Sequence, residues 1–282
     1  MIDLDIILIC YRQESYIEAA VDSILMQEVR SDVRVKLIVA DDCSPDKTLS
    51  LIKQRLNDKN DGRLLIRGVE YLESVRNVGI SRNYQRAFAA CNGDYIAIME
   101  GDDYWTKKYH LQQHIDFLQA HPECSMSMNR ITYTMNGEYK GVDGWQYKKD
   151  YHNYSLREQI EWHNLLGNLS ATMLRTNCVK CIPEKYFSVY FDDFLLGIAL
   201  AEYGDLGILK ESTSVYRGNS NSLWANMGKC KRIIRHFRHA RLYDQLLDYR
   251  YHSYWRTNKK RYVKGLWRSL KINIAHKISG KK

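Results

Sequence analysis

The feature that most constrains the fold is a short apolar run that ends in a group of acidic residues. Residues 95–99 (YIAIM) are apolar without alternation, and Glu100, Asp102 and Asp103 follow them. An unalternating apolar run between glycines predicts a strand that is buried on both faces, as in a parallel sheet covered by helices. Such sheets bind ligands beyond the carboxyl ends of their strands. We therefore expect these carboxylates at a ligand-binding edge.

Carboxylates so close together repel one another unless a cation lies among them. Carboxylate oxygens suit Mg²⁺ or Mn²⁺, and two of them could share an octahedral shell with substrate phosphates and water. No His or Cys stands nearby in the sequence to favour zinc. The alternative is that Asp102, Asp103 and Thr106 cap a helix that begins near Lys107, because Asp and Thr accept hydrogen bonds from free helical amides.

The residues before this run predict a repeated alternation of strand and helix. Apolar runs are separated by segments in which apolar residues recur at helical spacing. The order predicts an α/β chain with a parallel sheet, right-handed crossovers and helices on both faces. The three earlier strands are expected at 5–10, 33–40 and 64–72.

A second acidic pair ends another of these strands. Asp41 and Asp42 directly follow the strand at 33–40. Because parallel strands end at one edge, we expect this pair near Asp102 and Asp103. The chain has no G-x-G-x-x-G after the first strand and no G-x-x-x-x-G-K-[ST], which excludes a dinucleotide fingerprint and a P-loop. The phosphates of a bound nucleotide would have to be held by metal and Arg.

The order of these motifs resembles that of family 2 glycosyltransferases of the GT-A fold, of the type that builds bacterial polysaccharides and cell-surface glycans. The resemblance spans most of residues 4–224. It rests on YRQE at 11–14 with ILMQ at 24–27, VADDCS at 39–44, RNVG at 76–79 through GDY at 93–95, and EGDDYW at 100–105. It implies a Rossmann-like, mostly parallel central sheet flanked by helices. The implied segments are a nucleotide-sugar-binding half at 1–110, an acceptor-binding half at 111–228 and a basic helical extension at 229–282.

The resemblance assigns the first half to the donor, a nucleotide-diphosphate sugar. Tyr11 and Glu14 would border the nucleobase, and Asp42 would accept a hydrogen bond from it. Arg82 would face the base or the diphosphate, and Asp102 would contact the ribose. Uridine is the commonest base in the family, while guanosine and thymidine remain open.

The resemblance also implies a metal cofactor, Mn²⁺ or Mg²⁺, that bridges the diphosphate. Asp103 would bind it, together with Asp102. Glu100 stands where the D-x-D motif of the family has its first Asp. This exchange keeps the charge and lengthens the side chain, so the composition of the metal shell stays open.

In the family, an acidic residue at the start of a helix in the second half is the catalytic base. Asp193 matches that position best, and Asp192 is the reserve candidate. An inverting transfer is a single displacement, so the acceptor hydroxyl must lose its proton as the new bond forms, and a carboxylate can take it. The alternative for both residues is helix capping, because acidic side chains favour helix N-termini.

Two further stretches of the second half are assigned to the site. The segment SVYRGN at 214–219 resembles the family segment that closes the site, but many members have His where Asn219 stands, and we expect Arg217 to compensate. Residues 136–165 are polar, aromatic and rich in turns. They are expected to form a loop, either an acceptor platform or a surface insertion.

The net charge of +9 conceals a division of the chain. Residues 229–282 contain 17 Lys and Arg but 2 Asp, whereas residues 1–228 contain 25 basic and 31 acidic residues. Apolar residues of the tail follow helical faces. A basic amphipathic helix can lie on an anionic membrane, each Lys or Arg adding about 1 kcal/mol. The alternatives are packing on the body and, less favoured, binding to nucleic acid.

The sequence contains no apolar run of membrane-spanning length and no signal-peptide pattern, so a cytoplasmic protein is expected, peripheral on the inner face of the plasma membrane if the tail binds lipid. The leading hypothesis is an inverting, metal-dependent glycosyltransferase acting on a saccharide or lipid-linked glycan. A catalytically inactive nucleotide-sugar-binding protein is the alternative, which the departures at Glu100 and Asn219 support. A sugar nucleotidyltransferase is less favoured, because the basic, Gly-rich phosphate loop is missing.

Overall fold

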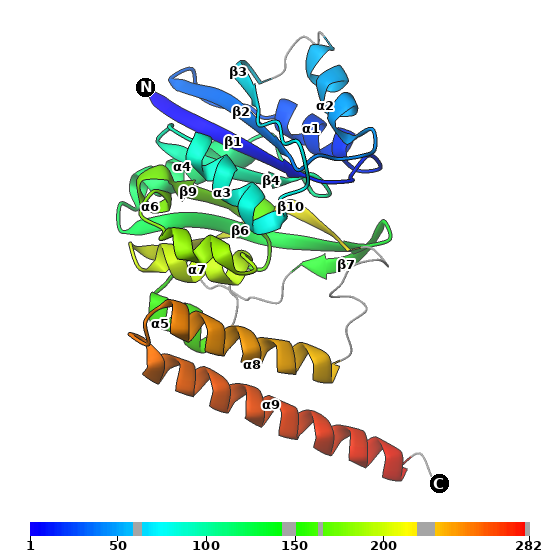
Figure 1. The fold of residues 1–282 in the computed structure, drawn as a ribbon, viewed down its shortest axis with the longest axis vertical. Helices are drawn as coiled ribbons and strands as arrows, with labels where there is room; N and C mark the ends of the chain where they lie inside the picture. Colours follow the sequence, from blue (N-terminus) through cyan, green and yellow to red (C-terminus); the bar gives the residue numbers. More distant parts are fainter. Residues whose placement is uncertain (59–63, 143–150, 163–165, 219–228, 280–282) are drawn as a thin grey trace.

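A computed structural model describes residues 1–58, 64–142, 151–162, 166–218 and 229–279. In these residues one ten-stranded sheet runs through the molecule, with helices on both faces (Figure 1). The strand order is β3-β2-β1-β4-β9-β6-β10-β5, with β7 paired to β6 and β8 to β10.

The first half of the chain forms the expected parallel layer. The register of β1 on β2, β1 on β4 and β2 on β3 is parallel throughout, so these strands end at one edge. Unalternating apolar sequence explains their position, because β1 and β4 are buried almost completely. The elements are β1 (Ile2–Cys10), α1 (Ile17–Leu25), β2 (Val33–Asp41), α2 (Thr48–Asn57), β3 (Ile66–Tyr71), α3 (Ile80–Ala90) and β4 (Tyr95–Glu100).

The second half does not continue this pattern, and the prediction of a mostly parallel sheet is wrong there. Strand β9 lies between β4 and β6 and is antiparallel to both. The described sheet contains five antiparallel and four parallel pairings, so it is mixed. The short turn between β6 and β7 explains one of these pairings, because antiparallel neighbours need no crossover helix.

The elements of the second half differ from the expected ones in extent. The loop predicted at 136–165 contains β7, β8 and α5, while residues 143–150 and 163–165 lie outside the described residues. The elements are β5 (Tyr104–Trp105), α4 (His110–Ala120), β6 (Cys124–Met135), β7 (Glu138–Val142), β8 (Tyr151–Tyr154), α5 (Leu156–Trp162), the 3-10 turn η1 (Leu169–Ala171), β9 (Thr172–Arg175), α6 (Thr176–Val179), the 3-10 turn η2 (Glu184–Ser188), α7 (Asp193–Ala201) and β10 (Asp205–Gly218).

The basic tail forms two helices, α8 (Lys229–Leu246) and α9 (His252–Ser279), beneath α5 and α7 (Figure 1). Tyr243, Leu247 and Trp255 are fully buried and belong to the same apolar cluster as α7. Helix α8 and the start of α9 therefore pack on the body of the protein. Farther along α9, Val263 and Trp267 are 43% and 63% exposed. Within the described part of the chain, no helix is long and apolar enough to span a bilayer.

Candidate active site

The acidic loop after β4 is built into the sheet edge and does not cap a helix. Helix α4 begins at His110 with Tyr109 as its N-cap and without a capping side chain, so the capping interpretation of Asp102, Asp103 and Thr106 is wrong. Gly101 lies close to the Gln13 and Ile17 side chains, whose ends would have to shift to make room for a Cβ at this position. The loop is thus held against the start of α1.

Asp103 lies inside this loop and is only 1% exposed. Its Oδ2 accepts hydrogen bonds from Asn168 Nδ2 at 2.7 Å and from Ser170 Oγ at 2.8 Å. Its Oδ1 accepts one from the backbone N–H of Arg217 at 3.0 Å. Ser170 also accepts a bond from the backbone N–H of Glu100 at 3.0 Å. Side chains of the second half therefore fix the acidic loop of the first half.

The carboxyl groups of this loop are buried close to one another, and their pKa values are raised. Burial, and then the charge of Asp102, raises the pKa of Asp103 to about 7. Burial and the charges of Asp103 and Asp102 raise the pKa of Glu100 well above its ordinary value, although Tyr84 donates a 3.0 Å hydrogen bond that opposes the shift. Burial also raises the pKa of Asp102, and Arg217 opposes this. A cation among these groups would lower all three pKa values.

The carboxylate oxygen atoms of this loop are the type of ligand that hard divalent cations such as Mg²⁺ prefer. No group of three or more metal-ligating side chains occurs in the described residues, so substrate and water oxygens would have to complete the shell. The three protein donors to Asp103 leave it little free acceptor capacity. Of the two residues predicted as metal ligands, Asp102 is the less engaged.

Arg217, near the end of β10, supplies a positive charge at this loop. Its guanidinium lies 4.4 Å from the centre of the Tyr104 ring and 5.6 Å from that of Tyr16. Stacking on aromatic rings holds a guanidinium in a defined place. Asn219, the expected departure from the family, lies outside the described residues.

Both halves of the chain contribute to a cavity of about 200 Å³ beside the acidic loop. Asp193, the first residue of α7, lines it together with Glu100 at the end of β4. Asp192 is the N-cap of α7, and its Oδ1 accepts the 2.9 Å hydrogen bond of the Leu195 amide. The capping interpretation is therefore correct for Asp192. Asp192 lines the cavity as well, together with Asn168, Tyr190 and Tyr216, and Oδ1 of Asp193 accepts a 2.9 Å hydrogen bond from the Phe194 amide.

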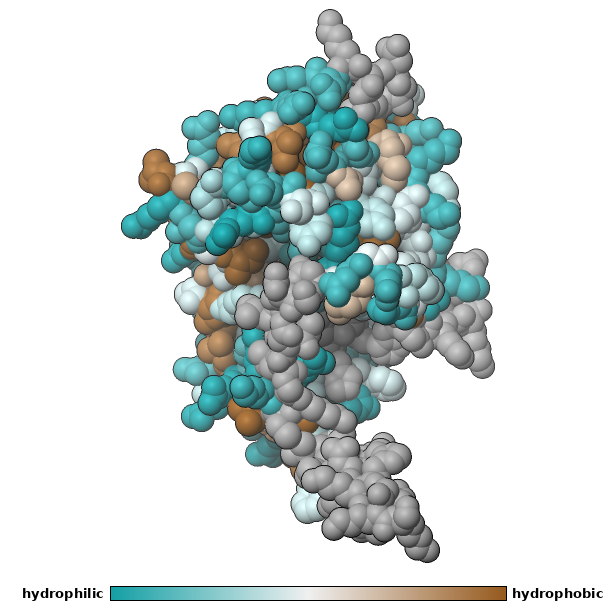
Figure 2. Space-filling view, turned by 90° about the vertical axis from the view of Figure 1, so that its right-hand side faces the viewer, coloured by the Kyte–Doolittle hydropathy of each residue, from teal (hydrophilic) through white to brown (hydrophobic). Residues whose placement is uncertain are grey.

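The predicted nucleobase residues lie at the ends of β1 and β2. Tyr11 is 40% exposed. Glu14 accepts a hydrogen bond from the amide of Lys47 at 3.1 Å. Asp42 is 2% exposed and accepts bonds from the amides of Val78 at 2.8 Å and Gly79 at 2.9 Å. Asp42 thus ties the RNVG segment to the end of β2, and this edge has a mostly hydrophilic surface (Figure 2).

Arg82, in the first turn of α3, follows the RNVG segment that Asp42 holds. It does not line the cavity, and its guanidinium lies 3.7 Å from Glu184. It lines a separate pocket with Arg76 and Asn77. Asn168 and Ser170 could not be found from the sequence, because an isolated polar residue carries no periodic signal, and the apolar spacing of α3 indicates a core position for Tyr84 rather than its hydrogen bond to Glu100.

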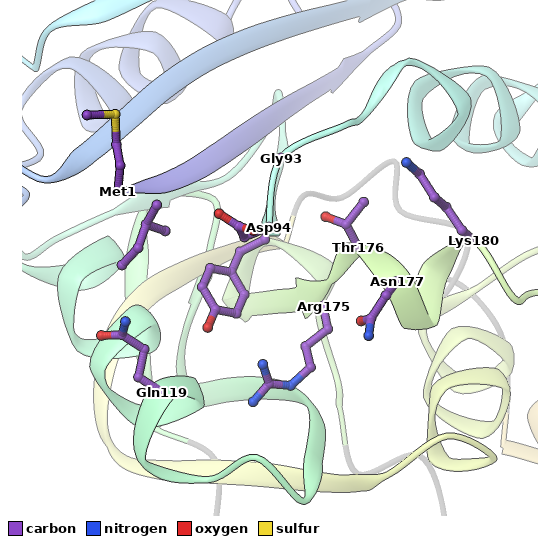
Figure 3. Close-up of a pocket in the computed structure, with 10 residues that line it drawn as sticks. Met1, Gly93, Asp94, Gln119, Arg175, Thr176, Asn177 and Lys180 are labelled. Carbon is purple, nitrogen blue, oxygen red and sulfur yellow. The ribbon is translucent and has the colours of Figure 1, made fainter.

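A larger pocket, about 550 Å³, lies at the opposite edge of the sheet (Figure 3). Gly93 and Asp94, just before β4, line it, whereas Glu100 ends that strand. The Arg175 guanidinium in this pocket is already engaged by the backbone carbonyls of residues 118, 121 and 124. The Arg175 guanidinium therefore stabilises the fold, and none of the predicted site residues lines this pocket.

The fold and the site define the chain as an α/β protein of the GT-A type. S. aureus TarS in complex with UDP-GlcNAc has a similar structure, with a TM-score of 0.60 and 19% identity over 86% of this chain and 65% of TarS. Mannosyltransferase PcManGT from Pyrobaculum calidifontis, in complex with GDP-Man and Mn²⁺, is similar with a TM-score of 0.54 and 16% identity over 84% of this chain and 60% of that one. The profile of glycosyl transferase family 2 matches residues 5–177. The chain belongs to glycosyl transferase family 2.

Relatives with known sequences extend the match beyond this region. Rv1520 of Mycobacterium tuberculosis, which is uncharacterized, is 26% identical over 226 residues, or 78% of this chain and 60% of the relative. TuaG of Bacillus subtilis is 33% identical over 117 residues, 42% of each chain. The chain thus spans 60% of the length of the mycobacterial relative. Asp193, Arg217 and the tail lie outside the stretch matched by the family profile.

Proposed function

We propose that the chain is an inverting glycosyltransferase that moves a sugar from a nucleotide-diphosphate sugar to a hydroxyl of a saccharide or lipid-linked glycan. The observation that carries this proposal is the shared cavity, in which Glu100 from β4 faces the same space as Asp193 from α7. A single displacement needs a donor-binding site, which open sheets form beyond their strand ends, and a carboxylate that can take the proton of the acceptor hydroxyl. The first half of the chain supplies the strand end, and the second half supplies the carboxylate. The structures of TarS with UDP-GlcNAc and of PcManGT with GDP-Man support a nucleotide-sugar donor, and a UDP-sugar is our first choice.

In the proposed reaction, Asp193 is the general base. Its carboxylate takes the proton from the acceptor hydroxyl as that oxygen bonds to the anomeric carbon. The bond from the anomeric carbon to the diphosphate oxygen breaks, and its electron pair leaves with the nucleoside diphosphate. Attack from the face opposite the leaving group inverts the anomeric configuration.

On the donor side, Tyr11, Glu14 and Asp42 would border the nucleobase and Asp102 the ribose. Arg217 would place its guanidinium against the diphosphate, since its position beside Asp102 is already fixed by two aromatic rings. Arg82 could reach the donor only after its side chain leaves Glu184.

A divalent cation, Mn²⁺ or Mg²⁺, fits the donor side of the site. Asp102 and Asp103 would hold it, and it would supply positive charge for the leaving diphosphate. Asn168 and Ser170 orient Asp103 through their hydrogen bonds. Residues 1–110 would thus form the donor-binding half and residues 111–228 the acceptor-binding half, from which Arg217 reaches back to the donor.

The basic tail supports the further proposal that the protein works at an anionic membrane on the cytoplasmic side. Arg256, Lys260 and Lys264 recur at helical spacing on the exposed side of α9, near exposed Trp267. We expect binding to anionic vesicles that is lost on Arg256→Glu, Lys260→Glu and Lys264→Glu together. Unchanged co-sedimentation of this triple variant would refute the membrane role of α9. Deleting 229–282 is a poorer test, because Tyr243 and Trp255 belong to the core.

The proposal is tested by release of nucleoside diphosphate from a panel of nucleotide sugars, with Mn²⁺, with Mg²⁺ and with EDTA. We expect metal-dependent release from one donor and its loss in Asp103→Ala. Donor binding that needs Asp103 but gives no release with any acceptor would favour the binding-protein alternative. Absence of binding under every condition would contradict the assignment of Asp42, Asp102 and Asp103.

A further inference from the structure

The C-terminal segment holds helix α7 at both of its ends. At the N-terminal end, Tyr243 Oη of α8 donates a 2.9 Å hydrogen bond to Oδ1 of Asp192, the N-cap. At the C-terminal end, Tyr251 Oη donates a 3.3 Å bond to Glu202, the C-cap. Between them Phe194 of α7 packs edge-on against the rings of Tyr243 and Trp255. The segment is thus fixed to the helix whose first residue lines the cavity.

The contact at Asp192 is buried and specific. Tyr243 is fully buried, and its ring is anchored by the aromatic cluster, so its hydroxyl has one defined position. Oδ1 of Asp192 receives two donors, the Tyr243 hydroxyl and the Leu195 amide. His239 Nδ1 lies 3.7 Å from the other oxygen. Hydrogen bonds to a charged acceptor are stronger than neutral ones, so Tyr243 restrains the cap strongly.

The same helix reaches another residue of the cavity. Tyr190 lines the cavity two residues before the cap, and the Arg235 guanidinium of α8 lies 5.3 Å from the centre of its ring. Arg235, His239 and Tyr243 lie four residues apart, so one face of α8 follows the segment from Tyr190 to Asp192. The contacts of α8 therefore concentrate on the residues that lead into Asp193.

We propose that Tyr243 is a positioning residue of the glycosyltransferase, which acts through Asp192 to set the direction of the Asp193 carboxylate. Fixing the N-cap fixes the backbone at the first turn of α7, and with it the position from which Asp193 enters the cavity. A catalytic group must be held within a fraction of an ångström of its productive geometry. The inference rests on the proposed function, in which Asp193 is the base.

The test compares Tyr243→Phe with Tyr251→Phe. Each substitution removes one hydroxyl that bonds a carboxylate at an end of α7, but only the hydroxyl of Tyr243 bonds a residue that lines the cavity, Asp192. For Tyr243→Phe we expect amide exchange in the first turn of α7 to rise about tenfold, and kcat at saturating donor to fall about tenfold to a hundredfold, with donor Kd unchanged. Tyr251→Phe should leave exchange at that turn and kcat unchanged. In the background of Asp192→Ala, Tyr243→Phe should add no further loss.

Equal exchange at the first turn of α7 in the two Tyr variants would overturn the inference, whether or not a donor has been found. Equal kcat in the two variants, with turnover by the native protein, would overturn it as well. Absence of turnover by the native protein with every donor, while exchange still separates the two variants, would contradict the proposed function and leave the structural coupling established.

Discussion

Asn168 donates a 2.7 Å hydrogen bond to Asp103 at a place where both side chains are at least 96% buried. Because Asn168→Asp replaces this donor with a second acid, we expect a loss of about 2 to 4 kcal/mol in the free energy of unfolding. Urea denaturation measures it. Asn177→Asp, at an exposed position, is the control and should change stability by less than about 0.5 kcal/mol. Equal effects would show that Asn168 does not support the acidic loop.

The metal-free protein should lose stability as the pH rises. The pKa of Asp103 is raised from 3.8 to about 7 in the folded protein, so its contribution to stability is present below about pH 4 and is lost as the pH approaches 7. The expected slope is about 1 kcal/mol per pH unit relative to Asp103→Asn, which lacks the titration. Unfolding in EDTA at several pH values measures the difference. A difference between native and Asp103→Asn protein that does not change with pH would contradict the assignment.

Adding Mn²⁺ or Mg²⁺ should offset this loss. An ion that binds only the folded state stabilises it by about 2.7 kcal/mol at 100 times its Kd. Thermal melting at pH 7 with and without the ion measures the gain. Asp102→Asn should abolish it, because Asp102 is the less engaged of the two predicted ligands. A gain that survives in Asp102→Asn would place the ion elsewhere.

Arg217 and Arg82 are both expected at the donor, but their contacts differ: Arg217 stacks on Tyr104, whereas Arg82 lies 3.7 Å from Glu184. We expect Arg217→Ala to weaken donor binding about tenfold to a hundredfold, because it removes the fixed cation beside Asp102. Arg217→Lys keeps the charge but not the stacking on Tyr104, so an intermediate loss is expected. Arg82→Ala is the matched comparison. Calorimetric titration with the donor would contradict the geometry if Arg82→Ala had the larger effect.

The tail should contribute to the stability of the body. Trp255 of α9 is fully buried, whereas Trp267 of the same helix is 63% exposed. We expect Trp255→Ala to cost about 3 to 5 kcal/mol, and Trp267→Ala less than about 0.5 kcal/mol. Urea denaturation of the full chain measures both. Similar small effects would mean that the tail does not share the core.

The parallel layer could be predicted from sequence because its central strands, β1 and β4, are nearly continuous runs of buried residues. The residues around Ile7 and Ile98 meet apolar neighbours on both faces, so their composition alone indicates a strand. Strand β10 carries no such signal, since Lys210 and Glu211 interrupt its apolar residues where the register shifts between Leu209 and Ser212. The antiparallel insertion of β9 depends on long-range pairing, which no local pattern specifies.

The site residues that could be predicted from sequence are those that directly follow a recognisable strand. Asp102 and Asp103 are adjacent to a strand end, and the structure places them there. Asn168 lies 65 residues from its partner Asp103, so only the fold brings the two together. Local pattern also could not separate Asp192 from Asp193, because both stand at the start of one helix. Their contacts differ in the structure: Asp192 accepts bonds from the Leu195 amide and from Tyr243, 51 residues later, whereas Asp193 accepts one from the Phe194 amide.

The most direct test of the central claim compares Asp193→Asn with Asp192→Asn in a transfer assay at saturating donor. Asn is a good N-cap, so Asp192→Asn should keep α7 and most of the rate. Loss of a general base should lower kcat about a hundredfold or more in Asp193→Asn, while donor Kd stays unchanged. A transfer rate in Asp193→Asn equal to that of the native protein would contradict the assignment of Asp193 as the base.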